Sequence, residues 1–336
     1  MKKIMFFRPM FYMGGTEIAI LSLISKLDIN KYEVIIGYTD ETSDIKLLNR
    51  FEKYCKVIKL NTNIKVDILI NCSPYTTSID ECTLVERTYT YLWFHHFGNR
   101  GDSILGNTEY LNYFDKIIVV SESTKHILET QEYYNSIKDK IEVIYNVIDI
   151  EKIIEESNIP INLELGKDLN LVTVSRLTHR KGFDRKLHLA KLLKEKNIDF
   201  KWYIIGSNYY KEIEEEIINK FNDLKENFVF LGFLENPYNI IKKCDYLALL
   251  SDDETWGLTL TEAKLLHVPC IVTNFDVAYE QINYDNGVIL SRNNLNSYSS
   301  NIDYILKNKT KLKKNLKNYT YSNDETLKLW DNLLNI

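Results

Sequence analysis

The chain has 336 residues, 45% of them hydrophobic and 26% charged. This composition is that of a folded protein and excludes a disordered tail, and at roughly 150 residues per domain the length predicts two domains. The net charge of −5 argues against a general nucleic-acid binder, so we expect no nucleic-acid partner.

Few features point to a redox, metal or membrane role. The five cysteines never form a C-x-x-C pair, which predicts reduced thiols rather than a zinc site or a disulfide framework. The apolar start ends at Arg8 and Pro9, too early for a signal peptide, and no run approaches the ~18 apolar residues of a membrane span. We therefore expect a cytoplasmic protein; peripheral contact with the cytoplasmic face of the inner membrane stays open.

Short apolar runs alternate with helix-period segments along the first half. The expected strands, apolar on both faces as in buried parallel sheets, are residues 3–7, 33–38, 56–60, 67–70, 90–94, 116–121 and 141–147. Helical spacing recurs between them, for example at 17–27 and 123–130. This rhythm predicts a doubly wound α/β domain.

The rhythm falters after Asp149, where a charged stretch with Pro160 and Gly166 predicts a linker over 151–168. It then resumes, with strands expected at 171–175, 202–206, 228–232, 246–251, 270–274 and 287–290, and helices at 184–196, 211–224, 235–243, 258–266 and 297–308. We therefore expect two Rossmann-like domains, 1–155 and 156–317, with a C-terminal helix within 318–336 that packs back on the first. Such sheets bind ligands at the carboxyl ends of their strands, which predicts a cleft between the domains.

The strongest chemical signal is the segment from Ser251 to Ala263, SDDETWGLTLTEA. It places Glu254 after a strand and Glu262 one turn into the next helix. The N–H groups of Gly257, Leu258 and Thr259 can bind a diphosphate at that helix start, and carboxylates beside it can accept hydrogen bonds from hydroxyls. The pattern thus favours a sugar nucleotide, whereas taken alone Glu254 is equally a loop acid and Glu262 a helix-start charge.

A second segment, VSRLTHRKG, follows the first strand of the second half. Arg176 and Lys181 are its candidates for a diphosphate, because arginine adds bidentate geometry and lysine a mobile point charge. Arg180 is expected in a solvated basic loop.

Two weaker signals lie in the first half. Gly14 and Gly15, in M-G-G-T-E, would let the backbone approach a phosphate, although a plain turn explains them as well. His95, in W-F-H-H, follows a strand; a lone histidine is more often structural, and the role of His96 stays open.

In this order the segments resemble the GT-B fold glycosyltransferases of family 4, the retaining, nucleotide-sugar-dependent group with E-x7-E and R-L-x3-K-G motifs. The resemblance implies that Glu254 contacts the donor sugar, Glu262 the ribose and His95 the transferred sugar. It also implies contacts of Gly206 with the nucleoside and of Phe233 with the base. Val147 and His267 replace glycines of the family pattern, and we expect a left-handed backbone at His267.

The expected activity is therefore transfer, with retention, of a sugar from a nucleotide-diphosphate sugar, UDP-linked, to a hydroxyl of a glycan or lipid-linked acceptor in bacterial surface polysaccharide synthesis. No D-x-D occurs, and Arg176 and Lys181 can supply the charge that a metal would bring, so we expect no metal and no cofactor. Two alternatives stay open: a GT-B-like sugar-nucleotide epimerase, and a catalytically silent partner subunit of a glycosyltransferase complex.

Overall fold

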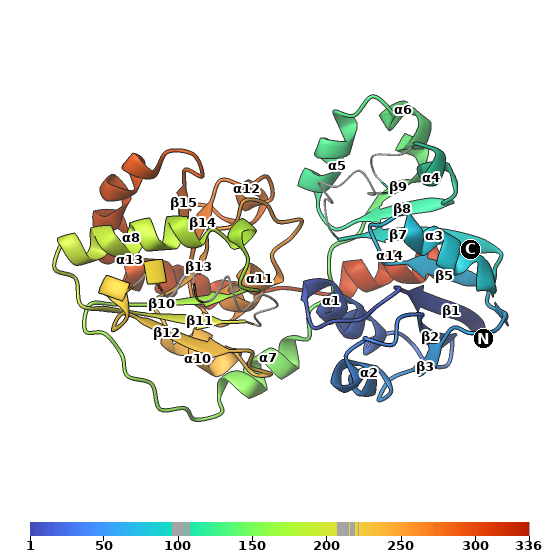
Figure 1. Cartoon of the computed structure of the whole chain (residues 1–336), viewed down its shortest axis with the longest axis horizontal. Helices are drawn as coiled ribbons and strands as arrows, with labels where there is room; N and C mark the ends of the chain where they lie inside the picture. The colour runs from blue at the N-terminus through green and yellow to red at the C-terminus, as the bar shows by residue number, and fades with distance from the viewer. Residues whose placement is uncertain (96–103, 105–107, 207–214, 216–218, 221, 336) are drawn as a thin grey trace. The chain divides into compact units, whose positions relative to one another are not determined.

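The computed structural model describes residues 1–95, 104, 108–206, 215, 219–220 and 222–335. The chain divides into two compact units, Met1–Ile148 with Ser322–Ile336 and Asp149–Tyr321 (Figure 1). The expected boundary at 155/156 falls inside a helix, α7 (Ile150–Ser157), which belongs to the second unit. The first part of the expected linker is thus helical, because Ile150 and Ile153 lie on one face and Ile153 is buried.

In unit 1 the described residues form a seven-stranded sheet in the order β3-β2-β1-β5-β7-β8-β9, parallel at every pair. Its strands are β1 (Lys2–Phe7), β2 (Tyr32–Tyr38), β3 (Lys56–Lys59), β5 (Ile68–Asn71), β7 (Tyr89–Phe94), β8 (Lys116–Val119) and β9 (Ile141–Val143). A short ladder pairs β4 (Ile64–Lys65) with β6 (Val85–Glu86). The helices are α1 (Gly15–Ile24), α2 (Ile45–Phe51), α3 (Thr77–Glu81), α4 (Thr108–Asn112), α5 (Glu122–Glu129), α6 (Tyr134–Ile137) and α14 (Asp324–Leu334).

The C-terminal helix α14 is part of unit 1. Its Trp330 is buried, with ring centroids 4.8 Å from Trp93 and 6.4 Å from Phe6. The hydroxyl of Tyr32 donates to Asp331 Oδ1 at 2.8 Å. The amphipathic spacing of α14 thus supplies an apolar face that packs against the side chains of β1 and β7.

In unit 2 the described residues form a six-stranded parallel sheet, β12-β11-β10-β13-β14-β15. Its strands are β10 (Leu169–Val174), β11 (Phe200–Ile205), β12 (Phe228–Gly232), β13 (Tyr246–Leu249), β14 (Cys270–Thr273) and β15 (Gly287–Leu290). Besides α7, the helices are α8 (Phe183–Glu195), α10 (Tyr238–Lys243), α11 (Leu258–Leu265), α12 (Ala278–Gln281) and α13 (Tyr298–Asn315). The expected helix at 211–224 lies largely outside the described residues.

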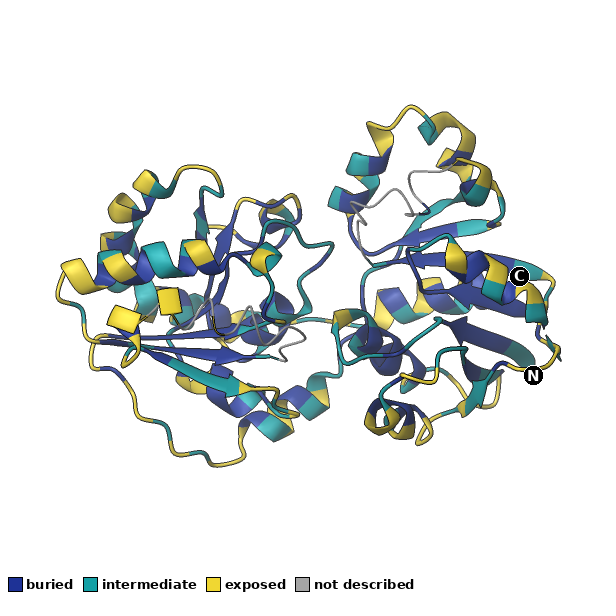
Figure 2. Ribbon diagram, in the orientation of Figure 1, coloured by how far each residue is buried: buried dark blue, intermediate teal, exposed yellow. Residues whose placement is uncertain are grey.

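The central strands of both sheets are nearly fully buried (dark blue in Figure 2), whereas the edge strands β3, β9 and β12 are only partly buried. In unit 2 the strands share one apolar cluster with buried residues of α8 and α13. A parallel sheet in which helices cover buried strands is the doubly wound architecture that the alternating pattern predicts, so the α/β expectation is confirmed.

Candidate active site

The strand order of unit 2 reverses beside its first strand. From β10 the chain continues outward through β11 and β12, and it returns to the other side of β10 with β13. Loops that follow the two strands flanking such a switch point diverge and leave room for a ligand at the carboxyl edge. The R-L-x3-K-G segment follows β10 and the E-x7-E segment follows β13, so the fold brings the two strongest signals to one place.

A glycine allows the first loop to approach the second. Gly182 has φ +69°, and a Cβ there would lie 1.8 Å from the carbonyl oxygen of Leu250 at the end of β13. Only glycine fits this turn, which precedes α8. The loop after β10 is therefore held against the loop after β13.

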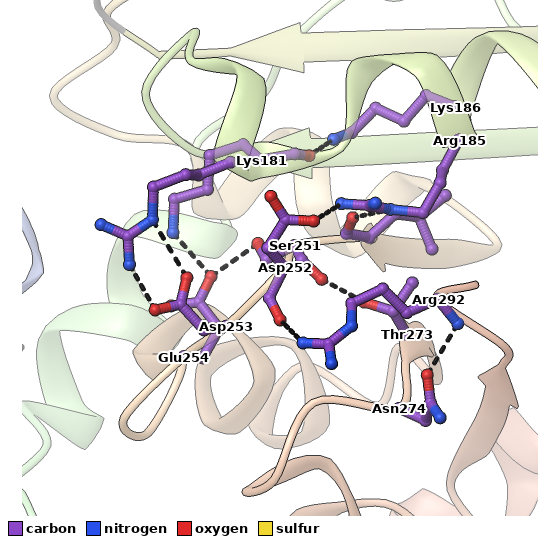
Figure 3. A network of polar contacts seen from close by, with 12 residues as sticks. Lys181, Arg185, Lys186, Ser251, Asp252, Asp253, Glu254, Thr273, Asn274 and Arg292 are labelled. Atoms are coloured by element: carbon purple, nitrogen blue, oxygen red, sulfur yellow. Dashed lines mark hydrogen bonds and ion pairs between the residues drawn. The ribbon is translucent and has the colours of Figure 1, made fainter. Parts of the chain in front are cut away.

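Each acid of the run 252–254 contacts a cation (Figure 3). Lys181 Nζ lies 2.6 Å from Glu254 Oε1, and Arg185 Nη2 lies 2.5 Å from Asp252 Oδ1. Arg180 binds the carboxylate of Asp253 through two nitrogens. The Arg180 side chain keeps 43% of its surface exposed, in line with the expected solvated segment, and the ion pair with Asp253 is an addition to that expectation. Arg176, by contrast, is exposed after β10.

Two arginines that the sequence reasoning missed fix the backbone of the acid run. Arg185 Nε donates to Leu250 O at 2.8 Å, and Arg292 donates to Asp252 O. Ser251 Oγ donates to Glu254 Oε1 at 2.7 Å. Glu254 is therefore oriented from two sides, and its side chain keeps 14% of its surface exposed.

Helix α11 begins directly after this run. Gly257, with φ +75°, precedes its first residue Leu258, and no side chain caps the helix. The first N–H groups of a helix have no acceptor within it and carry partial positive charge, so the start at Leu258 and Thr259 can bind an anion.

Glu262, one turn further on, is not part of the ion-pair network. Its side chain is buried and accepts a hydrogen bond from the Tyr238 hydroxyl at 3.4 Å. Burial raises the pKa of Glu262 to about 7, because desolvation disfavours its charged form. The structure thus separates Glu254, which is paired with Lys181, from Glu262, whose pKa is about 7.

The weaker candidates of unit 2 follow the neighbouring strands. A Cβ on Gly206, after β11, would lie 1.8 Å from Ser175 O, so glycine is required for this close approach to the loop after β10. Phe233, after β12, keeps 45% of its surface exposed. All predicted residues of unit 2 except Glu262, which lies within α11, thus follow the carboxyl ends of strands or stand at the start of α11.

In unit 1 the predicted residues gather beside the switch point between β1 and β5. Gly14 is the N-cap of α1 and Gly15 its first residue. Arg8, which directly follows β1, forms an ion pair with buried Glu17 at 3.2 Å. Sequence reasoning missed Arg8; the available signal was a charge directly after a buried strand.

His95 follows β7 and packs on Trp93, with ring centroids 4.4 Å apart. Burial, and to a smaller extent the charge of Arg8, lowers the pKa of His95 to about 3, so the ring is neutral at physiological pH. His96 and the polar loop 99–107, except Ile104, lie outside the described residues.

Comparison with known protein families identifies the family of the chain. The family model "Glycosyl transferases group 1" matches residues 154–323, just over half of the chain. The chain therefore belongs to the group 1 glycosyl transferases, and the expectations of a glycosyltransferase and of a GT-B fold are confirmed.

Particular relatives refine the picture. An uncharacterized glycosyltransferase of Methanocaldococcus jannaschii is 31% identical over 175 residues, 51% of this chain and 42% of that protein. The chain thus matches less than half of that relative's length. The O-antigen biosynthesis glycosyltransferase WclY of Escherichia coli is 24% identical over 288 residues, 79% of this chain and 78% of WclY. The crystal structure of HepE from Anabaena in complex with UDP superimposes with a TM-score of 0.74 at 16% identity and covers both chains fully.

Within the described residues, no helix is long and apolar enough to cross a membrane. The same residues hold no group of three or more histidine, cysteine, aspartate or glutamate side chains arranged to bind a metal ion.

Proposed function

We propose that the protein is a retaining glycosyltransferase of family 4 that moves a sugar from a UDP-sugar to a hydroxyl of a glycan or lipid-linked acceptor in bacterial surface polysaccharide synthesis. The observation that carries this proposal is the meeting of two loops at the switch point of unit 2. There Lys181 and Glu254 lie in contact, and the uncapped start of α11 follows directly. This is the combination of charges that a diphosphate flanked by polyols requires.

The ion pair between Lys181 and Glu254 has a mechanistic use. When the donor binds, Lys181 exchanges the carboxylate for a phosphate oxygen, and Glu254 becomes available to accept hydrogen bonds from sugar hydroxyls. Cleavage of the anomeric C–O bond increases the negative charge of the leaving diphosphate. Lys181, Arg176 and the α11 amides therefore stabilise the transition state more than the ground state.

The local charge supports a reaction without a metal. Among the described residues, four cations (Arg180, Lys181, Arg185 and Arg292) contact the acid run Asp252, Asp253 and Glu254 or its backbone. Arg176 adds a fifth cation after β10. The net charge of these side chains is therefore positive, which favours binding of a diphosphate. Each carboxylate of the acid run already contacts a cation instead of being available to a metal ion. EDTA should leave turnover unchanged; loss of turnover that Mg²⁺ or Mn²⁺ restores would contradict this part of the proposal.

Two relatives support the finer assignments. WclY is named for O-antigen biosynthesis, which agrees with an acceptor that is a surface glycan. HepE was crystallised with UDP, which agrees with a uridine donor. A lipid-linked acceptor would bring the protein to the membrane surface, and sedimentation with phospholipid vesicles tests that contact.

A nucleotide panel followed by product analysis tests the function. UDP should raise the unfolding temperature more than GDP, ADP or UMP, because ligands that bind the folded state stabilise it. NMR of the product formed from a UDP-sugar should show the donor's anomeric configuration. An inverted product would exclude retention, and a new UDP-sugar formed without acceptor would indicate an epimerase. UDP binding without turnover of any acceptor would indicate a silent subunit.

A further inference from the structure

Lys186 is a buried lysine beside the site that the mechanism above leaves without a role. It lies in the first turns of α8 with 0% of its surface exposed. Its Nζ donates to the carbonyl oxygen of Lys181 (Figure 3). The same nitrogen lies 4.5 Å from the centroid of the Phe183 ring. Through this hydrogen bond Lys186 holds the residue that the proposed function places on the diphosphate.

The charged groups around Lys186 come from the loop after β10, helix α8 and the loop after β13. Lys181, in the loop after β10, and Arg185, in α8, repel it. Asp252 and Glu254, in the loop after β13, attract it, but their carboxylates already contact Arg185 and Lys181. Desolvation by burial is the largest effect, and together with the two cations it lowers the pKa of Lys186 well below its usual value.

Binding of a diphosphate changes this environment. The ligand brings at least two negative charges next to Lys181. In addition, Lys181 exchanges Glu254 for a phosphate oxygen, which leaves Glu254 without its closest cation. Both changes make the surroundings of Lys186 more negative, and both favour an ammonium over a neutral amine.

We propose that Lys186 takes up a proton from solvent when the donor diphosphate binds, so that it provides a second cation behind Lys181 only in the occupied site. The balance is simple: the neutral amine and one solvent proton give the ammonium, and no covalent bond to the ligand changes. Lys186 is a positioning residue, since it acts through the Lys181 carbonyl and does not touch the ligand. The inference rests on the proposed function, because it requires a diphosphate at this edge.

Titration calorimetry with UDP tests the proposal. The number of protons exchanged is obtained from the binding heat in buffers of different ionisation enthalpy. At pH 8.5 UDP is fully ionised, and so is Glu262, whose pKa is about 7, so neither obscures the count. The wild-type protein should take up about one proton more than Lys186→Met. Lys191→Met, which removes an exposed lysine of the same helix, should behave like the wild type.

Thermal unfolding of the variants separates this role from a purely structural one. Methionine fills the apolar space without a buried amine, so Lys186→Met should be at least as stable as the wild type while it binds UDP about tenfold more weakly. Equal proton counts in wild type and Lys186→Met, or no net uptake by the wild type at pH 8.5, would overturn the proposal; the wild-type count needs no variant.

Inorganic pyrophosphate distinguishes failure of this inference from failure of the proposed function. With pyrophosphate, uptake of about one proton more by the wild type than by Lys186→Met, in a protein that binds no UDP, would support Lys186 and refute the uridine donor. Binding of UDP with no proton uptake would refute Lys186 and leave the donor assignment standing. No binding of either ligand would refute both.

Discussion

The two units share an architecture but differ in the chemistry of their carboxyl edges. Both sheets are parallel and reverse their order beside the first strand of the unit. In unit 2 that edge carries a dense ion-pair network and the uncapped start of α11. In the described part of unit 1 the corresponding edge carries the ion pair of Arg8 with Glu17 and a neutral His95. We therefore expect the fold to fix where a ligand binds, and the side chains to decide between a diphosphate at the edge of unit 2 and an uncharged polyol at that of unit 1.

Removal of the unit 2 cations should have the largest effect on turnover. Lys181→Ala and Arg176→Ala should each lower turnover by about 10²–10³-fold and weaken UDP binding at least tenfold, because both cations stabilise the leaving diphosphate. His95→Ala should lower turnover yet leave the UDP affinity within about twofold, since a neutral ring adds no charge for the phosphates. Steady-state kinetics and UDP titration measure the two quantities.

Matched folding controls accompany that comparison. Arg176→Ala and Lys181→Ala should each show the circular dichroism and unfolding temperature of the wild type, because Arg176 is exposed and Lys181 half-buried. Equal loss of UDP affinity in His95→Ala and Lys181→Ala would contradict the division of roles between the units.

Much of this contrast could be predicted from the sequence. Buried parallel strands are continuous apolar runs, so the approximate positions of the described strands in both sheets could be predicted from the pattern of apolar residues along the sequence. The left-handed backbone expected at His267 is confirmed, with φ +61°; the residue lies in the short turn between the end of α11 at Leu265 and the start of β14 at Cys270. Such features depend on local sequence, which a single chain reveals.

What could not be predicted depends on partners far apart in the chain. Arg185 donates to the backbone of a residue 65 positions away, and Arg292 to one 40 positions away. A backbone carbonyl has no sequence signature, so nothing marked either arginine. Likewise, nothing in the sequence showed that the fold pairs each acid of the run 252–254 with a basic side chain about 70 positions away.

The glycines of the two edges should differ in what alanine costs. Gly182→Ala should destabilise unit 2 by about 3 kcal/mol or more, since φ is +69° and the new Cβ would overlap a backbone oxygen. Gly14→Ala should cost less than Gly182→Ala, because its φ of −169° suits any residue and the nearest atom, 2.9 Å away, is a side-chain oxygen of Glu17 rather than a backbone atom. Denaturant unfolding of the two variants measures the difference.

A third glycine allows the cost of the left-handed backbone to be measured apart from the cost of steric overlap. Gly232 has φ +65° with nothing within 4 Å of a new Cβ, so Gly232→Ala should cost only the conformational term, about 1–2 kcal/mol. If Gly182→Ala were no worse than Gly232→Ala, contact between the loops after β10 and β13 would not depend on that glycine. A normal unfolding curve with reduced turnover in Gly14→Ala would instead show that this glycine serves ligand approach.

The smallest expected effect is a dependence of UDP affinity on pH. We expect it to arise from a residue of unit 2 and not from one of unit 1. In the proposed site Glu262 accepts stronger hydrogen bonds from the ribose hydroxyls when it is ionised, and its pKa is about 7. Binding lowers that pKa and releases a proton, so affinity should rise between pH 6 and pH 8, by about tenfold. His95, with a pKa of about 3, stays neutral over this range and contributes nothing to the slope.

Two variants show which unit contains the residue that makes UDP affinity depend on pH. Titration of the UDP β-phosphate occurs in the same range and affects every variant alike, so the informative quantity is the difference from wild type at each pH. Glu262→Gln should lose the part of the slope due to the carboxylate, whereas His95→Gln should keep it. A slope that survives in Glu262→Gln and disappears in His95→Gln would place the titrating group in unit 1. His95 would then have to be protonated at physiological pH. The unit 1 edge would not be neutral, and the contrast between a charged and a neutral edge would be wrong.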